Sequence, residues 1–206
     1  TVPLELYAPA EGARLISGVG DYGSFTHRDL TRPAQEGSHA NPHFANCNGV
    51  TGAWLRQEMI VRVGYPFHNP TALGISYSED GGDSWTQCSS VPVEGARNGH
   101  IAVSADGSNW IWTPDRSDAY ITTDKGESWI QCQGLPRNMR IIADKVNPKR
   151  FYGVDAVNEI VYSSEDGGFT FRADTLSLTA RPTVRRQQQG PRANRGDNRG
   201  GQDRIY

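Results

Sequence analysis

One carboxylate in this sequence is distinguished by the glycines around it. Asp21 follows the apolar run 15–19 and lies among Gly18, Gly20 and Gly23. Glycines allow a tight turn in which the backbone can come close to a ligand. A carboxylate held at the end of a strand in this way could act as a general acid or base. The competing interpretation is that Asp21 only caps its turn by accepting hydrogen bonds from backbone N–H groups.

The histidines do not form a metal-binding pattern. His39, His43 and His68 are scattered among prolines and asparagines, and their spacing does not match that of a metal triad. We interpret them as loop residues. The sequence gives no indication of a cofactor.

A repeat provides the elements that must position these side chains. Three segments share the pattern S/T-x-D-x-G-x-S/T-W/F: 78–85, 122–129 and 164–171. Their aspartates are spaced by 44 and then 42 residues, close to the roughly 40–45 residues of a four-stranded propeller blade. The pattern resembles the Asp-box of sialidases, sortilin-type receptors and several glycoside hydrolases. It predicts an all-β fold of four-stranded antiparallel blades.

The Asp-box aspartates invite a catalytic or metal-binding interpretation, but their setting favours a structural role. Each box follows a short alternating strand and precedes another strand, so we expect a hairpin turn inside a blade. Asp and Ser side chains fix such turns through hydrogen bonds to nearby backbone N–H groups. We therefore assign Asp80, Asp124 and Asp166 to turn formation.

The three cysteines are expected to be buried thiols. Because their number is odd, at least one of Cys47, Cys88 and Cys132 has no partner within the chain. Cys88 and Cys132 each lie three residues after a tryptophan of a box. Equivalent strands of neighbouring blades diverge, whereas a disulfide needs Cα atoms within about 7 Å. We therefore predict that both are unpaired.

Composition and length set the domain organisation. With 21 basic and 23 acidic residues, the charge balance gives no reason to expect nucleic acid or a membrane as a partner. At the repeat spacing, residues 1–206 make about four to five blades, which predicts an incomplete propeller. We expect a fragment of a longer protein, or a chain completed by another polypeptide. Residues 181–204, rich in arginine and glycine, predict an exposed loop.

Residues 15–64 depart from the repeat and resemble glycoside hydrolase family 74. Residues 20–30 read Gly-Asp-Tyr-Gly-Ser-Phe-Thr-His-Arg-Asp-Leu, similar to the Gly-Asp-x-x-Gly-Phe-x-His-x-Asp-Leu motif near the start of the family's second propeller. Asn-Pro-x-Phe at 41–44 and Val-Arg-Val-Gly at 61–64 follow in the family's order. Ser24 stands where glycine is usual. The length of the segment before the first box predicts a blade with an insertion on its binding face.

The resemblance implies a fold, an activity and a set of partners. Family members consist of two seven-bladed propellers with a xyloglucan cleft between them. Asp21 corresponds to one of two catalytic aspartates, and we expect it to be the general acid of an inverting hydrolase. The other aspartate belongs to the first propeller, so we expect this chain alone to be inactive. The implied partners are a polysaccharide, xyloglucan or a related β-glucan, and the rest of the parent protein or a second propeller.

Three further residues are candidate substrate contacts: Tyr22, His27 and Trp54. His27 and Asp29 could orient Asp21 through hydrogen bonds, although a surface pair satisfied elsewhere fits the sequence equally well. Trp54 could present a flat platform to a sugar ring or could pack in the core.

Two other functions remain open from the sequence. A non-catalytic propeller, serving as a sortilin-like binding or assembly module, would use the boxes only as a scaffold. A sialidase would need an arginine triad, and its usual Arg-Ile-Pro element near the first blade is missing. Because a plant-wall polysaccharide is met outside the cell, we expect a secreted, extracellular parent protein.

Overall fold

The computed structural model describes residues 2–67, 69 and 71–175. The regular elements in this part of the chain are all β-strands, so it contains no helix that could cross a membrane. The segment 181–204, expected to be an exposed loop, lies outside the described residues.

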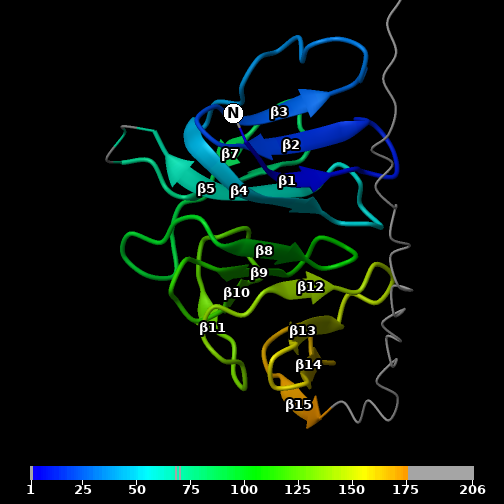
Figure 1. Ribbon diagram of the computed structural model, residues 1–206, viewed down its shortest axis with the longest axis vertical. Coiled ribbons are helices and arrows are strands. Elements are labelled where there is room, and N and C mark those ends of the chain that lie inside the picture. The colour runs from blue at the N-terminus through cyan, green and yellow to red at the C-terminus, as the bar shows by residue number, and fades with distance from the viewer. Residues whose placement is uncertain (1, 68, 70, 176–206) are drawn as a thin grey trace, which may run out of the picture. The chain divides into compact units, whose positions relative to one another are not determined.

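The strands follow one another in four groups along the chain (Figure 1). The first group is β1 (Pro3–Tyr7), β2 (Leu15–Val19) and β3 (Gly23–His27). The second is β4 (Phe44–Gly52), β5 (Ile60–Pro66), β6 (Ile75–Ser78) and β7 (Thr86–Gln87). The third is β8 (His100–Val103), β9 (Trp110–Thr113), β10 (Tyr120–Thr122) and β11 (Ile130–Gln131). The fourth is β12 (Ile141–Ala143), β13 (Phe151–Asp155), β14 (Ile160–Ser164) and β15 (Arg172–Thr175).

Within each group, consecutive strands pair antiparallel as a meander. The first strand of each group lies against the first strand of the next, in the order β1, β4, β8 and β12. This is how blades surround the axis of a propeller. The predicted all-β fold of four-stranded antiparallel sheets is confirmed for the second, third and fourth groups, and the described chain is a partial propeller.

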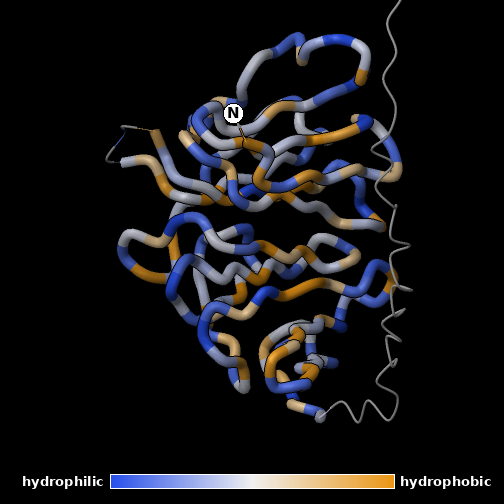
Figure 2. Tube along the Cα trace, viewed as in Figure 1, coloured by the Kyte–Doolittle hydropathy of each residue, from blue (hydrophilic) through white to orange (hydrophobic). Residues whose placement is uncertain are grey.

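The first group differs from the other three. It has three strands, and a single parallel pair, Gly23 with Asn46, joins β3 to β4. The connection 28–43 occupies the place that an Asp-box and a fourth strand take in the later groups. This connection is mainly hydrophilic (Figure 2). Residues 15–64, expected to form one blade with an insertion, divide between the first two groups at this connection.

The core lies between neighbouring blades, and β9 shows how the sequence builds it. Successive side chains of a strand point to opposite faces. Trp110 and Trp112 pack with side chains of the second group, whereas Ile111 packs with side chains of the fourth. All three are fully buried, and each contributes about 1.5–3 kcal/mol by leaving water. A strand covered on both faces therefore has a continuous apolar sequence.

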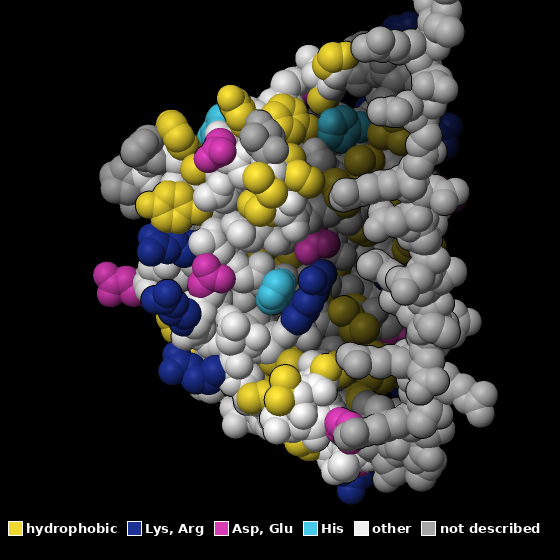
Figure 3. All heavy atoms as spheres, in the orientation of Figure 1, with side chains coloured by type: hydrophobic (Ala, Val, Ile, Leu, Met, Phe, Trp, Pro, Cys, Tyr) yellow, Lys and Arg dark blue, Asp and Glu magenta, His cyan; other side chains and the backbone are white. Residues whose placement is uncertain are grey.

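The innermost strands carry hydrophobic side chains that remain exposed. Figure 3 shows hydrophobic side chains on this face, next to a few charged groups. They include Leu4 and Leu6 of β1 and Ile142 of β12. A hollow of about 400 Å³ between these strands is lined partly by Glu5, His100 and Arg140.

The three Asp-boxes occupy equivalent hairpin turns before the last strand of the second, third and fourth groups. In the first box, the Ser78 hydroxyl donates to the Asp80 carboxylate at 2.7 Å and accepts the N–H of Gly82 at 2.8 Å. Asp80 also accepts the N–H groups of Asp83 and Ser84 and the Ser84 hydroxyl. The boxes at Asp124 and Asp166 repeat this pattern. The predicted turn-forming role of these aspartates is confirmed.

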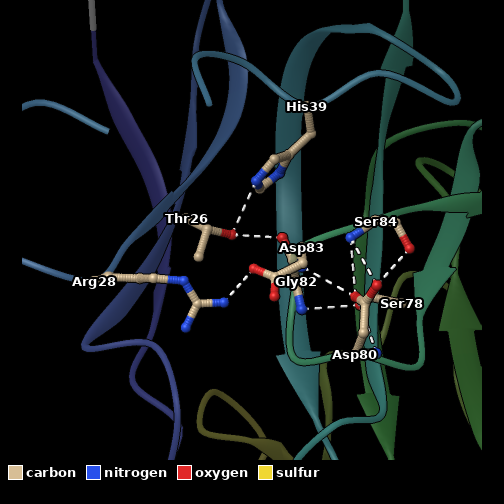
Figure 4. A network of polar contacts seen from close by, with 8 residues as sticks. All are labelled: Thr26, Arg28, His39, Ser78, Asp80, Gly82, Asp83 and Ser84. Atoms are coloured by element: carbon tan, nitrogen blue, oxygen red, sulfur yellow. Dashed lines mark hydrogen bonds and ion pairs between the residues drawn. The ribbon is translucent and has the colours of Figure 1, made fainter. Parts of the chain in front are cut away.

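Each box also bonds to the preceding blade. The Thr26 hydroxyl donates to the carbonyl of Gly82 at 2.8 Å (Figure 4). The Ser90 hydroxyl and the Asn109 amide donate in the same way to the second and third boxes, at Gly126 and Gly167. Hydrogen bonds to the carbonyls of the box turns thus connect each blade to the preceding one.

The cysteines are as predicted. Cys47, Cys88 and Cys132 are all unpaired and buried. The N–H of Cys88 donates to Ile75 and that of Cys132 to Ala119, so the two thiols occupy equivalent positions in adjacent blades.

Candidate active site

Asp21 lies in the short turn 20–22 that connects β2 to β3. Its backbone is left-handed, with φ 70°, and its N–H donates to the side-chain oxygen of Asn46 at 3.0 Å. The preceding residue, Gly20, donates its N–H to Val2 at 2.9 Å. The turn is therefore fixed through its main chain.

The carboxylate of Asp21 is exposed, and none of the described residues hydrogen-bonds to it. This distinguishes it from the aspartates of the boxes, each of which accepts bonds from its own turn. A carboxylate that only capped its turn would accept backbone N–H groups. The geometry instead leaves both oxygens of Asp21 available to an incoming ligand.

The glycines around Asp21 are required by close backbone packing. A Cβ on Gly23 would lie 2.7 Å from the carbonyl oxygen of Phe44, and Gly23 has φ 77°. A Cβ on Gly18 would lie 2.5 Å from the carbonyl oxygen of Cys47. Only glycine lets β2 and β3 approach the start of β4 this closely, and this approach brings Asn46 to Asp21.

Tyr22 is beside Asp21 and is 56% exposed. Two more aromatic side chains lie at the same end of the sheet, because Tyr65 pairs with Asn46 across β4 and β5. Tyr65 and Phe67 are 40% and 49% exposed. The guanidinium of Arg97 lies 4.9 Å from the centre of the Tyr65 ring. Sequence reasoning missed Tyr65 and Phe67, although two aromatic residues at the first and third positions after the Val-Arg-Val-Gly element were a usable signal.

His27 and Asp29 are not brought to Asp21. His27 is the last residue of β3, at the opposite end from the turn, and its Nε2 is 2.8 Å from the hydroxyl of Ser17. Asp29 accepts the hydroxyl and the N–H of Thr31 at 2.7 and 2.9 Å, and these bonds lower the pKa of Asp29. Both side chains are satisfied elsewhere.

Trp54 also lies away from Asp21. β3 begins at the Asp21 turn and runs parallel to β4, so the connection after β4 is at the other end of the sheet. Trp54 lies in this connection, is 38% exposed and has the ammonium of Lys145 5.5 Å from its ring centre. It is neither a core residue nor a neighbour of the candidate acid.

His39, expected to be a loop residue, is in the connection 28–43 but has a buried side chain. Its Nδ1 is 2.8 Å from the Ser24 hydroxyl. Its Nε2 is 2.9 Å from the Thr26 hydroxyl, a contact drawn in Figure 4. Its ring lies 5.0 Å from that of Trp85. Burial, assisted by the charge of Arg62, lowers the pKa of His39 to about 3, so it is neutral at physiological pH.

The other two histidines differ from His39. His43 is exposed and its ring lies 5.7 Å from that of Phe67, and His68 lies outside the described residues. Within residues 2–67, 69 and 71–175, histidine, cysteine and carboxylate side chains do not gather into a group that could hold a metal ion.

The blades and boxes together define a segment of an Asp-box β-propeller. No protein-family model matches the chain, but individual proteins do. A xyloglucanase from Paenibacillus sp is 35% identical over 170 residues, which are 82% of this chain and 16% of that protein. A probable oligoxyloglucan-reducing end-specific xyloglucanase from Neosartorya fischeri is 34% identical over 207 residues, covering 87% of this chain and 25% of that protein.

Solved structures agree with these relatives. The GH74 xyloglucanase from Xanthomonas campestris matches with a TM-score of 0.79 and 36% identity, over 84% of this chain and 24% of that one. The GH74 enzyme from Niastella koreensis matches with a TM-score of 0.72 and 29% identity, over the same shares of the two chains. These matches confirm the predicted relationship to glycoside hydrolase family 74, of which this chain represents a segment. The chain spans only 16% to 25% of the length of these curated relatives.

Proposed function

We propose that this chain is the part of a xyloglucan-degrading glycoside hydrolase that carries one of its two catalytic carboxylates, Asp21. The single observation that supports this role most is the state of the Asp21 side chain. Its backbone is anchored to Asn46, while its carboxylate is exposed and free of bonds from the described residues. The relationship to xyloglucanases supplies the substrate class.

The proposed reaction is hydrolysis of a β-1,4-glucosidic bond with inversion. Asp21 in its protonated form donates its proton to the glycosidic oxygen as the bond from that oxygen to the anomeric carbon breaks. A water molecule attacks the anomeric carbon from the opposite face and loses its proton to a second carboxylate. In inverting enzymes the two carboxyl groups are about 6.5–9.5 Å apart, which leaves room for the water. By the family resemblance, the second carboxylate lies outside this chain.

The setting of Asp21 suits this task. The glycines around the turn let β2 and β3 pack closely against β4, and the anchored main chain limits the movement of the acid. Tyr22 is the predicted substrate contact that we retain, because its exposed ring lies beside Asp21. We add Tyr65 and Phe67 as further contacts on the same side of the sheet. His27 and Trp54 lie at the other end.

The test compares two Asp→Asn variants of the full-length polypeptide that contains this chain. Asp21→Asn keeps the shape of the side chain and removes the proton donor, so xyloglucan hydrolysis should fall by at least about 10²–10⁴-fold while oligosaccharide binding persists. Asp80→Asn should lower the melting temperature with little direct effect on turnover. The assays are release of reducing ends and thermal unfolding of both variants.

Two outcomes would refute the assignment: full activity of Asp21→Asn, or robust hydrolysis by residues 1–206 alone. A non-catalytic module would be indicated if the full-length polypeptide bound xyloglucan without cleaving it. We also propose that the parent protein is secreted, because its polymeric substrate lies outside cells; hydrolytic activity found only in the cell lysate would contradict this.

A further inference from the structure

Arg62, in the centre of β5, is a buried cation without a carboxylate partner. Its side chain is fully buried, and it takes part in none of the ion pairs that the described residues form. Its guanidinium lies 4.8 Å from the centre of the Phe44 ring and 4.4 Å from that of Trp85. Burial lowers the pKa of Arg62 only to about 10, so the group is charged at neutral pH.

Neutral oxygens satisfy the guanidinium. Nε donates to the hydroxyl of Ser76 at 2.8 Å, and Nη1 donates to the hydroxyl of Ser24 at 2.8 Å. Nη2 donates to the carbonyls of Ala40 and Pro42 at 2.6 and 2.8 Å. The planar fork of arginine suits this arrangement, since its donors diverge in fixed directions.

A buried charge without an opposite charge is costly, and well-packed apolar residues often replace buried charges with no loss of stability. Core filling alone therefore does not account for Arg62. The distinctive feature is the set of segments that it joins. Ser24 belongs to β3, Ala40 and Pro42 belong to the connection 28–43, and Arg62 itself belongs to the second blade.

These segments are the ones that hold the Asp21 turn. Ser24 follows Asp21 by three residues, and Phe44, which stacks on the guanidinium, precedes Asn46 by two. Asn46 receives the N–H of Asp21. β3 and β4 share only one backbone pair, so side-chain contacts help to fix the turn against the second blade.

We propose that Arg62 is a positioning residue that holds Asp21 in place for proton donation. This inference rests on the proposed function of Asp21. Arg62 acts through Ser24 on one side of the turn and through Pro42 and Phe44 on the other. Loss of its fork lets the turn move against the second blade, and a displacement of about 1 Å at a reacting group can cost about 10²-fold in rate.

The test compares the hydrolysis rates of two substrates with different leaving groups, in the full-length polypeptide. A sugar leaving group needs a proton from the acid, whereas dinitrophenolate leaves without one. In Arg62→Lys, hydrolysis of a xyloglucan oligosaccharide should fall by about 10–100-fold. Hydrolysis of the matching dinitrophenyl glycoside should stay within about threefold, because proton donation contributes little to that reaction. A purely structural role would lower both rates equally and would overturn the proposal.

Two serines provide a matched pair if Arg62→Lys does not fold. Ser24 and Ser76 are both fully buried, and both accept a 2.8 Å bond from Arg62, but only Ser24 is on β3, the strand that follows the Asp21 turn. Ser24→Ala should show the leaving-group-dependent loss, and Ser76→Ala should lose stability without it. Equal leaving-group dependence in the two variants would overturn the proposal.

The Asp21→Asn variant shows which proposal is wrong if a test fails: the positioning role of Arg62 or the proposed function of Asp21. If Asp21→Asn shows the leaving-group dependence and the Arg62 and Ser24 variants do not, only the positioning role is wrong. If Asp21→Asn hydrolyses the oligosaccharide normally, the proposed function itself is wrong.

Discussion

Replacement of Asp124 by asparagine removes the charge from the middle Asp-box and keeps the shape of the side chain. The carboxylate accepts the hydroxyls of Thr122 and Ser128 at 2.7 and 2.5 Å, and the N–H groups of Glu127 and Ser128 at 3.1 and 2.9 Å. Asparagine has one acceptor oxygen, so its NH₂ group faces the Ser128 hydroxyl in place of the second oxygen. The variant therefore loses the charge-assisted part of this network.

The pKa of Asp124 gives the size of the effect. Burial alone would raise the pKa, but the hydrogen bonds from Ser128 and Thr122 outweigh it and lower the pKa from 3.8 to about 2. A shift of one unit corresponds to about 1.36 kcal/mol, so the upper limit is roughly 2.4 kcal/mol. Because the carboxylate is partly exposed and screened by solvent, we expect about 1–1.5 kcal/mol. For a chain of this size that is a fall of about 2–6 °C in melting temperature.

The pH dependence follows from the sign of the shift. A carboxylate whose pKa is lower in the folded state than in the unfolded state stabilises the fold at pH values above its unfolded-state pKa. That stabilisation is lost as the pH falls through the folded-state pKa. The difference in unfolding free energy between the wild type and Asp124→Asn should be constant above about pH 5. It should fall to about half by pH 3. The measurement is urea unfolding of residues 1–206 at a series of pH values.

Glu127→Gln is the control, because it removes a charge from the same turn and no side-chain hydrogen bond described in the structure. It should leave stability almost unchanged. A difference between the wild type and Asp124→Asn that did not vary between pH 7 and pH 3 would show that the charge of Asp124 does not carry the effect. A variant more stable than the wild type would refute the account of the box altogether.

Three further predictions concern buried groups. A thiol reagent should label the native chain slowly and the unfolded chain fully, because burial raises the pKa to about 11 for Cys47 and about 12 for Cys88 and Cys132; rapid native labelling would contradict this. Stability should fall as the pH is lowered from about 6.5 toward 3, because the unfolded chain binds a proton at His39 and the folded chain does not; urea unfolding of His39→Gln should show a shallower slope, and an unchanged slope would rule out His39 as its source. Gly126→Ala should lower the melting temperature by several degrees, since its φ is +83° and the new Cβ would lie 2.7 Å from the Cys88 sulfur; a wild-type value would show that the turn can relax.

The repeat made most of the fold predictable, because each box fixes one hairpin and the spacing fixes the number of strands between boxes. The first group was harder to predict, since the connection 28–43 has neither a box nor a fourth strand. The end of the sheet at which a loop emerges depends on how many strands come before it. For this reason Trp54 and Asp21 were predicted from the sequence to share one substrate site, whereas in the structure they lie at opposite ends of the sheet.

The Asp21 turn was predictable from its glycines, but its support was not. Arg62 and His39 are far apart in the sequence and contact the same serine through the fold. One local signal was available, because an arginine inside the apolar run 60–63 implies a buried cation. The partners of such a cation are backbone carbonyls and hydroxyls, which leave no distinctive pattern in a sequence.

The bonds between each box and the blade before it bear on how such a protein can be duplicated or recombined. The acceptor carbonyl belongs to one blade and its donor belongs to the previous one. The donors are Thr26, Ser90 and Asn109. A cut at a blade boundary separates donor from acceptor, although it leaves every strand intact. A segment exchanged between relatives therefore keeps a donor with its acceptor only if it begins before the donor and ends after the box that this donor contacts. Crossovers placed by this rule should yield folded chimaeras more often than crossovers placed between sheets.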